Sequence, residues 1–470
     1  MNSYAPSADS AAASMDVSTA STSLLTDMYE LTMLQGALAS GAASRRSVFE
    51  LFGRRLPGSR RFGVVAGTGR LLDAIEAFTF TPVQIDFLHR TGVVNDETLD
   101  FLRDYRFTGT VRGYAEGECY FAGSPLLTVE GTFAEACILE TLALSIYNYD
   151  CAVASAASRM TIAAHGRPCV DFGARRAHEQ AAVAAARASV VGGFVGTSNL
   201  EAGLLYGIPT VGTSAHSFTL LHDSEEDAFA AQVASLGPST TILVDTYDIA
   251  TGVERAVKAA RAAGGELGAV RLDSGDLVAE AFKVRAQLDA LGATSTKITV
   301  TNDLDEHAIA ALGAAPVDSY GVGTKLVTGS GRPTAALVYK LVEREGANGT
   351  MEEVAKFSSG GKSTVGGRKW AGRTLTSEGT AAEELVVSSS SQDQGLAALS
   401  EAGARPLQVL LVDEGRIIEE HRGKEALSAA TERHRAARAE LPYDAWRLSD
   451  GESALPTRHV DLDGRSATRR

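Results

Sequence analysis

Residues capable of nucleophilic and anion-binding chemistry recur after short apolar segments in the middle of the chain. His216 lies in TSAHSF, Arg175 follows VDFGA, and Arg271 and Asp273 belong to RLDSGD. An imidazole is a nucleophile that can carry a phosphoryl group, and a guanidinium can form paired hydrogen bonds with a carboxylate or phosphate. The two carboxylates around the Ser-Gly turn of RLDSGD suit a diol or a magnesium–phosphate complex.

A glycine-rich segment, GVGT, is the last of this series. Gly323 and Thr324 would offer backbone N–H groups and a hydroxyl near the start of a helix, which is a favourable seat for a phosphate. Standard nucleotide-binding motifs do not fit. GVGTKL and GTGRLL lack the third glycine of GxGxxG, and GGKS lacks the first glycine of a P-loop.

Helix capping is the alternative role for these residue types, because Ser, Thr, Asp and Asn are favoured at helix N-termini for hydrogen bonding alone. For Ser198-Asn199 and Asn302-Asp303 we prefer capping, whereas for RLDSGD and GVGT we prefer ligand binding. Arg175 and Arg176 could equally be a pair of surface arginines.

Metal-binding and redox motifs are not evident in the sequence. The nine histidines form no HExxH or comparable ligand pair, so we expect no metal held by the protein alone. The spacing of the four cysteines matches no metal knuckle and no CxxC pair. We interpret Cys119, Cys137, Cys151 and Cys169 as buried thiols in a reducing compartment.

The elements that must position these residues alternate regularly after Phe133. A long helical stretch is followed by short apolar strands, each with an Ala-rich helix after it. We expect strands at RPCVDFG, GGFVGTS, IPTVGTS, TTILVDTYD, GAVRLDSGD, KITVTND and DSYGVGT. Repeated βα units predict a parallel α/β sheet, and their number favours a closed (β/α) barrel over an open sheet. In such a barrel the chemistry lies at the carboxyl ends of the strands, where the polar residues above would meet.

Composition shifts divide the rest of the chain. Residues 1–22 are rich in Ala, Ser and Thr and are expected to be a disordered tail. Residues 23–132 mix helices and strands as an α+β domain, and 133–335 form the barrel. Residues 336–470 add strands and a charged helix that partly complete the α+β domain, and the stretch from Ser449 onward is expected to be mostly irregular.

Length and charge exclude several classes of function. The 470 residues carry a formal net charge of −14, which argues against a nucleic-acid or anionic-membrane surface. No apolar run approaches the roughly 18 residues of a membrane span, and no signal peptide is evident. At face value the acidity also argues against strongly anionic substrates.

Seven segments, taken in order, resemble the nicotinate phosphoribosyltransferase family. They cover about residues 24–330, with a weaker match at KFSSGGKSTVGGRKW, and they are TDMYELTM, FELFGRRLPG, VDFGARRAH, GTSNLEAG, GTSAHSF, RLDSGDL and GVGTKLVTG. The resemblance implies an irregular (β/α) barrel of the type II phosphoribosyltransferase kind plus an α+β domain. It further implies a cytosolic enzyme of NAD salvage, a homodimer with its site near the interface. Nicotinate, phosphoribosyl pyrophosphate and ATP would react there, with Mg²⁺, to nicotinate mononucleotide, pyrophosphate, ADP and phosphate.

The resemblance also implies roles for individual residues. His216 would be phosphorylated by ATP, and Phe172 would stack on the pyridine, with Tyr29 of a neighbouring subunit as a second ring. The nicotinate site would include Arg175, Ser198, Thr213 and Arg271, and the phosphoribosyl pyrophosphate site would include Asp273, Gly275, Gly323 and Thr324. Arg271 and Asp273 would also be catalytic. These arginines, Lys325 and the backbone of the glycine loop would supply local positive charge, which removes the objection to anionic substrates.

Two other activities remain as alternatives. Nicotinamide phosphoribosyltransferases are expected to have an Asp where this chain has Ser198, so Ser198 favours nicotinate. A sugar-phosphate lyase or aldolase would need a Schiff-base lysine at a strand end, and only Lys325 is available there. A non-catalytic scaffold would show no preference for any small ligand.

Overall fold

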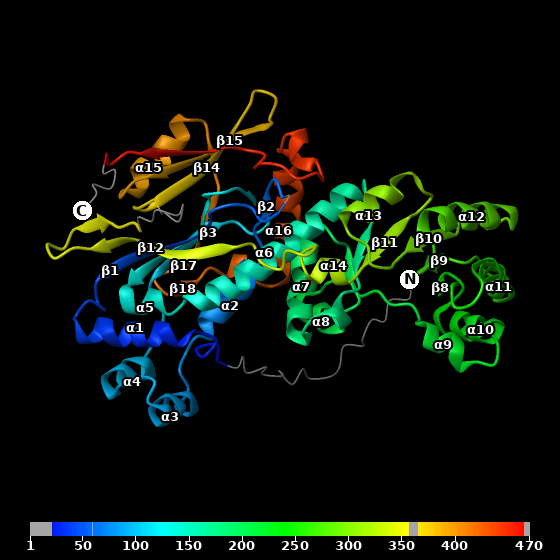
Figure 1. The fold of residues 1–470 in the computed structure, drawn as a ribbon, viewed down its shortest axis with the longest axis horizontal. Helices are drawn as coiled ribbons and strands as arrows, with labels where there is room; N and C mark the ends of the chain where they lie inside the picture. The colour runs from blue at the N-terminus through cyan, green and yellow to red at the C-terminus, as the bar shows by residue number, and fades with distance from the viewer. Residues whose placement is uncertain (1–20, 59, 357–364, 465–470) are drawn as a thin grey trace, which may run out of the picture.

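The computed structural model describes residues 21–58, 60–356 and 365–464. The chain forms two lobes that share one long helix, α6 (Glu140–Ala163) (Figure 1). Most of the predicted tail lies outside the described residues. Its last two residues are held in place, because the Ser21 and Thr22 hydroxyls donate to the carbonyls of Thr79 (2.5 Å) and Ala74 (2.6 Å).

An antiparallel sheet of seven strands forms the centre of the first lobe. Three N-terminal strands lie in its middle and two later strands flank them on each side, in the order β13 (Met351–Glu353), β12 (Leu337–Glu345), β1 (Arg46–Gly53), β5 (Pro125–Thr132), β3 (Thr110–Tyr114), β17 (Gln408–Asp413) and β18 (Arg416–Ile417). The helices of this lobe are α1 (Met28–Ala39), α2 (Thr68–Glu76), α3 (Pro82–Thr91), α4 (Asp96–Arg103) and α5 (Phe133–Cys137). The predicted hairpin at LQVLLVDEGRII is confirmed as β17 and β18.

Smaller sheets complete this lobe. A four-stranded sheet has the order β16 (Arg405–Pro406), β14 (Lys369–Leu375), β15 (Ala381–Ser388) and β19 (Thr457–Asp461), with α15 (Gln392–Glu401) against it, and β2 (Gly63–Val64) pairs with β4 (Cys119–Tyr120). The expectation of an irregular stretch after Ser449 is wrong over β19. There, five consecutive residues, from Thr457 to Asp461, pair in parallel with β15.

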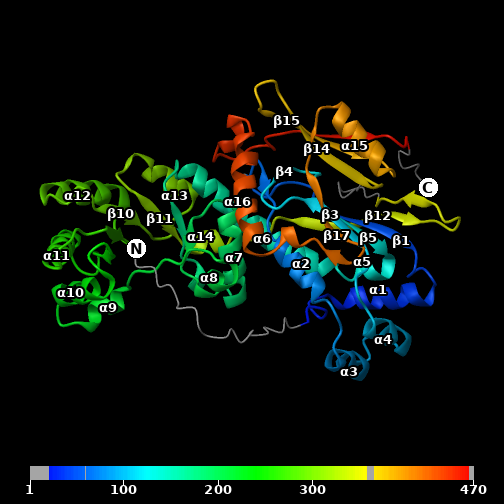
Figure 2. The ribbon, with the colours of Figure 1, turned by 180° about the vertical axis from the view of Figure 1, so that it is seen from behind.

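The second lobe contains the predicted parallel sheet. Its six strands have the order β7 (Gly196–Thr197), β6 (Cys169–Asp171), β11 (Ser319–Val322), β10 (Lys297–Val300), β9 (Ala269–Leu272) and β8 (Thr241–Leu243). The helices around it are α7 (Glu179–Val191), α8 (Leu200–Tyr206), α9 (His216–Leu221), α10 (Glu225–Leu236), α11 (Ile249–Ala262), α12 (Leu277–Ala290), α13 (Glu306–Ala311) and α14 (Thr324–Val327) (Figure 2).

The α/β class is confirmed, and the barrel is a curled, open arc rather than a closed ring. The seventh expected strand, IPTVGTS, pairs with the sheet only at Thr210, beside Thr197 of β7. Pro209 has no N–H to extend the ladder there. Within the described chain, β7 and β8 end the sheet without pairing to each other.

Helix α6 is buried along most of its length because small residues allow its neighbours to approach closely. Leu142, Ile146 and Cys151 pack in the apolar core of the first lobe, whereas Val153 and Met160 pack in the core of the second. This helix therefore fixes the two lobes relative to each other. Helix α16 (Gly423–Ala439) also contacts both α7 and α2.

The four cysteines are buried free thiols, as predicted. Burial raises the pKa of Cys119 and of Cys169 to about 12, so these thiols stay protonated at neutral pH. Among the described residues, no helix is both long and apolar enough to cross a membrane.

Candidate functional site

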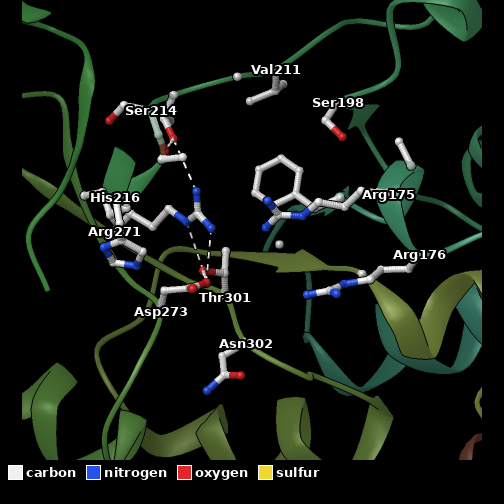
Figure 3. A pocket seen from close by; sticks show the side chains of 18 of the residues that line it. Arg175, Arg176, Ser198, Val211, Ser214, His216, Arg271, Asp273, Thr301 and Asn302 are labelled. Carbon is white, nitrogen blue, oxygen red and sulfur yellow. Dashed lines mark hydrogen bonds and ion pairs between the residues drawn. The ribbon is translucent and has the colours of Figure 1, made fainter. Parts of the chain in front are cut away.

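A pocket of about 450 Å³ opens at the carboxyl edge of the parallel sheet. Loops after all the strands of the arc except β8 supply its walls, and β8 adds its last residue, Leu243 (Figure 3). The lining includes Phe172, Arg175, Arg176, Ser198, Val211, Thr213, Ser214, His216, Arg271, Asp273, Thr301, Asn302, Asp303, Gly321, Gly323 and Thr324.

The strand register explains why these residues meet. Asp171 of β6 is level with Thr197 of β7 and Val322 of β11, and Leu272 of β9 is level with Val300 of β10. Each strand thus ends at the same edge, and the next residues of the chain face one space. The prediction that the polar strand ends converge is confirmed for Phe172, Arg175, Ser198, Thr213, His216, Arg271, Asp273, Gly323 and Thr324.

The guanidinium of Arg271 is the most connected group in the pocket. It donates from Nε to Thr301 (2.9 Å), from one terminal nitrogen to Thr213 (3.4 Å) and from the other to Asp273 (3.1 Å). The Thr301 hydroxyl also donates to Asp273. The cation is therefore held in one orientation and partly neutralised by a carboxylate.

The ring of Phe172 forms an aromatic surface beside this cation. Its centroid lies 5.5 Å from the Arg271 guanidinium carbon. Gly321 leaves the room for the ring, because a Cβ at that position would lie 2.6 Å from two ring carbons and from the Thr301 methyl group. A planar ligand stacked on Phe172 would have a positive charge close by.

The carboxylate of Asp171 organises the turn after β6. It is fully buried and accepts hydrogen bonds from the Gly173 N–H (2.7 Å) and the Thr197 hydroxyl (2.7 Å). Burial raises the pKa of Asp171, while these two bonds favour its ionised form and act in the opposite direction. Asp171 therefore ties the arginine-bearing turn to the neighbouring strand.

His216 is the first residue of α9 and lies beside the loop that follows β8. Its Nδ1 is 3.1 Å from the Thr246 hydroxyl, and its Nε2 is 4.0 Å from Oδ1 of Asp245. That Oδ1 atom is buried and has no hydrogen-bond partner among the residues that the structure describes, while Oδ2 accepts from the Asp273 N–H and the Ser274 hydroxyl. The imidazole remains 43% exposed, so a ligand can reach Nε2.

Arg175 and Arg176 occupy a short 3₁₀ turn, η1 (Ala174–Arg176), and both side chains are exposed to the pocket. Neither guanidinium forms a hydrogen bond or ion pair with any residue that the structure describes. Ser198 lines the same side of the pocket (Figure 3). Two uncompensated cations facing a cavity make it suitable for anions.

Three residues of DSGD have separate roles. Asp273 faces the pocket, while Asp276 caps α12 by accepting from the Ala279 N–H (3.2 Å). Gly275 lies between them with φ = +82°, a backbone conformation that favours glycine, and it does not line the pocket.

The expected caps are correct in one case and wrong in the other. Asn199 caps α8 through the Ala202 N–H (3.0 Å), which leaves Ser198 facing the pocket. Asn302 and Asp303 line the pocket instead of capping α13, whose cap is Asp305. Their φ angles of +99° and +38° turn the chain across the pocket, and αL backbone is tolerated by Asn and Asp.

Two residues from the sequence-based set lie elsewhere. Tyr29 is on α1 in the first lobe, 47% exposed, and does not line this chain's pocket. Lys325 follows the glycine loop but is not among the lining residues. The weak match at KFSSGGKSTVGGRKW lies partly outside the described residues.

Several lining residues were not assigned to the site from sequence. They include Arg176, Val211, Ser214, Thr301, Asn302 and Asp303. Residues 301–303 directly follow strand β10, and this position could have predicted that they line the pocket. We instead interpreted Asn302 and Asp303 as helix caps.

Gly321, the Phe172 ring and the Thr301 methyl group form the floor of the pocket. Substitution of Gly321 by Ala tests how tightly this floor is packed. The added methyl group would overlap the Phe172 ring, so we expect a loss of about 1–3 kcal/mol in unfolding free energy. The Phe172 ring should also move in a crystal structure of the variant. Gly212→Ala is the control, because a Cβ there has no atom within 4 Å. Equal urea midpoints for the two variants would contradict this description of the floor.

Comparison with known proteins agrees with the fold and the site. The chain matches the nicotinate phosphoribosyltransferase N-terminal domain over residues 24–148 and the nicotinate phosphoribosyltransferase family over residues 168–358. It is 51% identical to nicotinate phosphoribosyltransferase pncB1 of Mycobacterium tuberculosis, with 93% of this chain and 95% of that protein aligned. It is 37% identical to the nicotinate phosphoribosyltransferase of Bacillus subtilis, over 74% of this chain and 72% of that one.

A solved structure shares the fold. The crystal structure of human nicotinic acid phosphoribosyltransferase superposes with a TM-score of 0.77 at 24% identity, covering 93% of this chain and 98% of that chain. The two matched families together cover most of the described chain, including every residue that lines the pocket. The chain therefore belongs to the nicotinate phosphoribosyltransferase family.

Proposed function

We propose that this pocket transfers a phosphoribosyl group from phosphoribosyl pyrophosphate to the ring nitrogen of nicotinate, with ATP as a co-substrate, as the first step of NAD salvage from nicotinate. One observation carries the proposal. A single pocket is lined by an aromatic ring, by two arginines that pair with no described residue and by a glycine loop at a helix start, in a chain of this family.

Each substrate has a suitable part of the pocket. The pyridine would stack on Phe172, with Thr213 beside it and its carboxylate toward Arg175 and Ser198. The ribose hydroxyls would bond to Asp273, on the RLDSGD turn that Gly275 allows, and the 5-phosphate would bind at Gly323 and Thr324. The acceptor nitrogen and the ribose carbon C1 would then meet near Arg271.

The transfer step follows from these positions. The pyridine nitrogen attacks C1 of the ribose, the bond from C1 to pyrophosphate breaks, and nicotinate mononucleotide and pyrophosphate result. Positive charge develops on the ribose ring, and Asp273, which lines the pocket, would stabilise it. Arg271, held by three hydrogen bonds, needs no reorientation as charge moves.

Magnesium would accompany the diphosphate rather than occupy a site of its own. Among the described residues, no group of three His, Cys, Asp or Glu side chains is arranged to hold a metal ion. Asp273 and Asp303 line the pocket and provide the oxygen ligands that magnesium prefers. When bound, the ion would neutralise the charge that develops on pyrophosphate.

ATP would act through His216. With Nδ1–H donated to Thr246, Nε2 is free to attack the γ-phosphorus of ATP, forming an N–P bond and releasing ADP. The Asp245 carboxylate, 4.0 Å from Nε2, would stabilise the positive charge that the ring gains in this step, and the Nδ1 proton would then pass to solvent. Water would later cleave the N–P bond and release phosphate, which couples ATP hydrolysis to the transfer.

The pocket favours nicotinate over the alternatives. Asp273 and Asp303 are its only lining carboxylates in the described chain, and Ser198 stands beside the unpaired Arg175. A carboxylate substrate therefore meets positive charge there. No lysine lines the pocket in the described chain, which disfavours a Schiff-base aldolase. The buried thiols are compatible with a reducing cytosol.

Product analysis tests the proposed activity. The purified chain, given phosphoribosyl pyrophosphate, Mg²⁺ and ATP, should convert nicotinate to its mononucleotide and leave nicotinamide unchanged in chromatographic assays. Ser198→Asp should lower nicotinate turnover because the new carboxylate repels the substrate, whereas Ser198→Ala should retain most of it. Turnover of nicotinamide alone by the unmodified protein would overturn the proposal.

Removal of the imidazole tests the coupling to ATP. His216→Ala should retain slow transfer and lose the stimulation by ATP, because no phosphohistidine can form. The control is His222→Ala at the other end of α9, where the ring bonds to the Phe218 carbonyl (2.8 Å) outside the pocket. ATP stimulation of His216→Ala equal to that of the unmodified protein would show that His216 has no coupling role.

We further propose a homodimer with twofold symmetry that completes the site. Two sets of exposed apolar side chains are relevant here. The first set lies around α1 and consists of Leu25, Met28, Tyr29 and Met33. The second set lies around the pocket mouth and consists of Leu200, Leu204, Val211, Leu220 and Leu221. The first set lies in the lobe without the pocket, at a distance from the second (Figure 1). A twofold dimer that covers each set with the other would bring Tyr29 of one copy to the partner's pocket.

Mixed dimers test this arrangement. Tyr29→Ala and His216→Ala should each lose ATP-stimulated activity as homodimers. After unfolding and refolding together, about a quarter of the sites should be intact if Tyr29 acts across the interface. If mixing restores nothing although mixed dimers form, Tyr29 does not complete the partner's site.

A further inference from the structure

The adjacent arginines of η1 are the pocket's free cations. Arg271 is paired with Asp273, whereas Arg175 and Arg176 contact no carboxylate among the described residues. Both line the cavity and both are exposed to it. Two like charges on consecutive residues repel each other, so binding an anion at each position relieves an unfavourable interaction.

The 3₁₀ turn separates the two side chains. Such a turn has three residues per turn, so consecutive side chains project in directions about 120° apart. In Figure 3 both side chains extend into the pocket, Arg175 on the side of Ser198 and Arg176 on the side of Asn302. The two guanidiniums therefore face different parts of the pocket.

The turn also packs directly on the glycine loop. A Cβ on Gly173 would lie 2.2 Å from the Val327 side chain of α14 and 3.2 Å from the Gly323 carbonyl. A Cβ on Gly323 would lie 3.5 Å from the Phe172 carbonyl. The backbone that carries Arg176 is thus in contact with the proposed seat of the 5-phosphate.

We propose that Arg176 binds the phosphoryl groups of phosphoribosyl pyrophosphate, so that two consecutive arginines serve two different anionic substrates. This inference rests on the proposed function. Arg175, beside Ser198 and Phe172, is left for the nicotinate carboxylate. Arg176 supplies the uncompensated positive charge at the phosphate end, where Asp273 and Asp303 would otherwise make the pocket acidic.

Steady-state kinetics of matched variants separate the two roles. Arg176→Gln should raise KM for phosphoribosyl pyrophosphate roughly tenfold or more, the loss expected for a charge-assisted contact, with KM for nicotinate nearly unchanged. Arg175→Gln should show the opposite pattern. Arg176→Lys should be intermediate, because lysine keeps the charge without the planar fork. Arg435→Gln on α16, paired with Glu432 at the surface, controls for loss of one positive charge.

Inhibition by fragments identifies the phosphoryl group involved. Weaker inhibition of Arg176→Gln by ribose 5-phosphate would indicate the 5-phosphate, and weaker inhibition by pyrophosphate would indicate the diphosphate; either result supports the proposal. An unchanged KM for phosphoribosyl pyrophosphate, or a selective rise in KM for nicotinate, would overturn it.

Calorimetry keeps this test separate from the proposed activity. Binding of phosphoribosyl pyrophosphate to the unmodified protein and to Arg176→Gln can be compared without turnover. If the unmodified protein makes no nicotinate mononucleotide but binds phosphoribosyl pyrophosphate through Arg176, the activity fails and this inference stands. If the two proteins bind phosphoribosyl pyrophosphate equally, the inference fails whatever the activity.

Discussion

The guanidinium of Arg271 connects four segments that are distant in sequence. It reaches Thr301 after β10, Asp273 after β9 and Thr213 in the loop at the open side of the arc, and it lies against the Phe172 ring after β6. Because the sheet is not closed by hydrogen bonds between β7 and β8, side-chain contacts of this kind hold the pocket's walls together. The contact between His216 and Thr246 spans the same opening. The shape of the pocket therefore depends on polar side chains that also face the substrates.

Local charge in the pocket is opposite to the charge of the whole chain. The protein carries a net charge of −14, yet three arginines and two carboxylates line the cavity in the described chain. One arginine is neutralised by Asp273 and fixed in place, and two remain free for ligands. This division lets a single cavity position one cation for the reaction while it attracts anionic substrates.

Much of the site could be predicted from the sequence, because strand ends in a parallel sheet meet at one edge whatever the details of packing. Arg175, Arg271 and Asp273 were found in this way, whereas Phe172 and Ser198 were assigned through the family resemblance. The open arc could not be predicted, since a single contact at Thr210, next to Pro209, decides whether the seventh strand forms. Asn302 and Asp303 were missed because their left-handed backbone depends on the surrounding loops, whereas capping is a local preference. The strand β19 likewise depends on a distant partner, β15.

A crystal structure with nicotinate mononucleotide and pyrophosphate bound tests the central claim most directly, namely that one pocket seats the pyridine and the phosphates at opposite ends. The account predicts the pyridine on the face of Phe172, its carboxylate within hydrogen-bonding distance of Arg175, and the 5-phosphate on the N–H groups of Gly323 and Thr324. A nucleotide bound outside this cavity, or bound with its phosphate at Ser198 and Arg175, would contradict it.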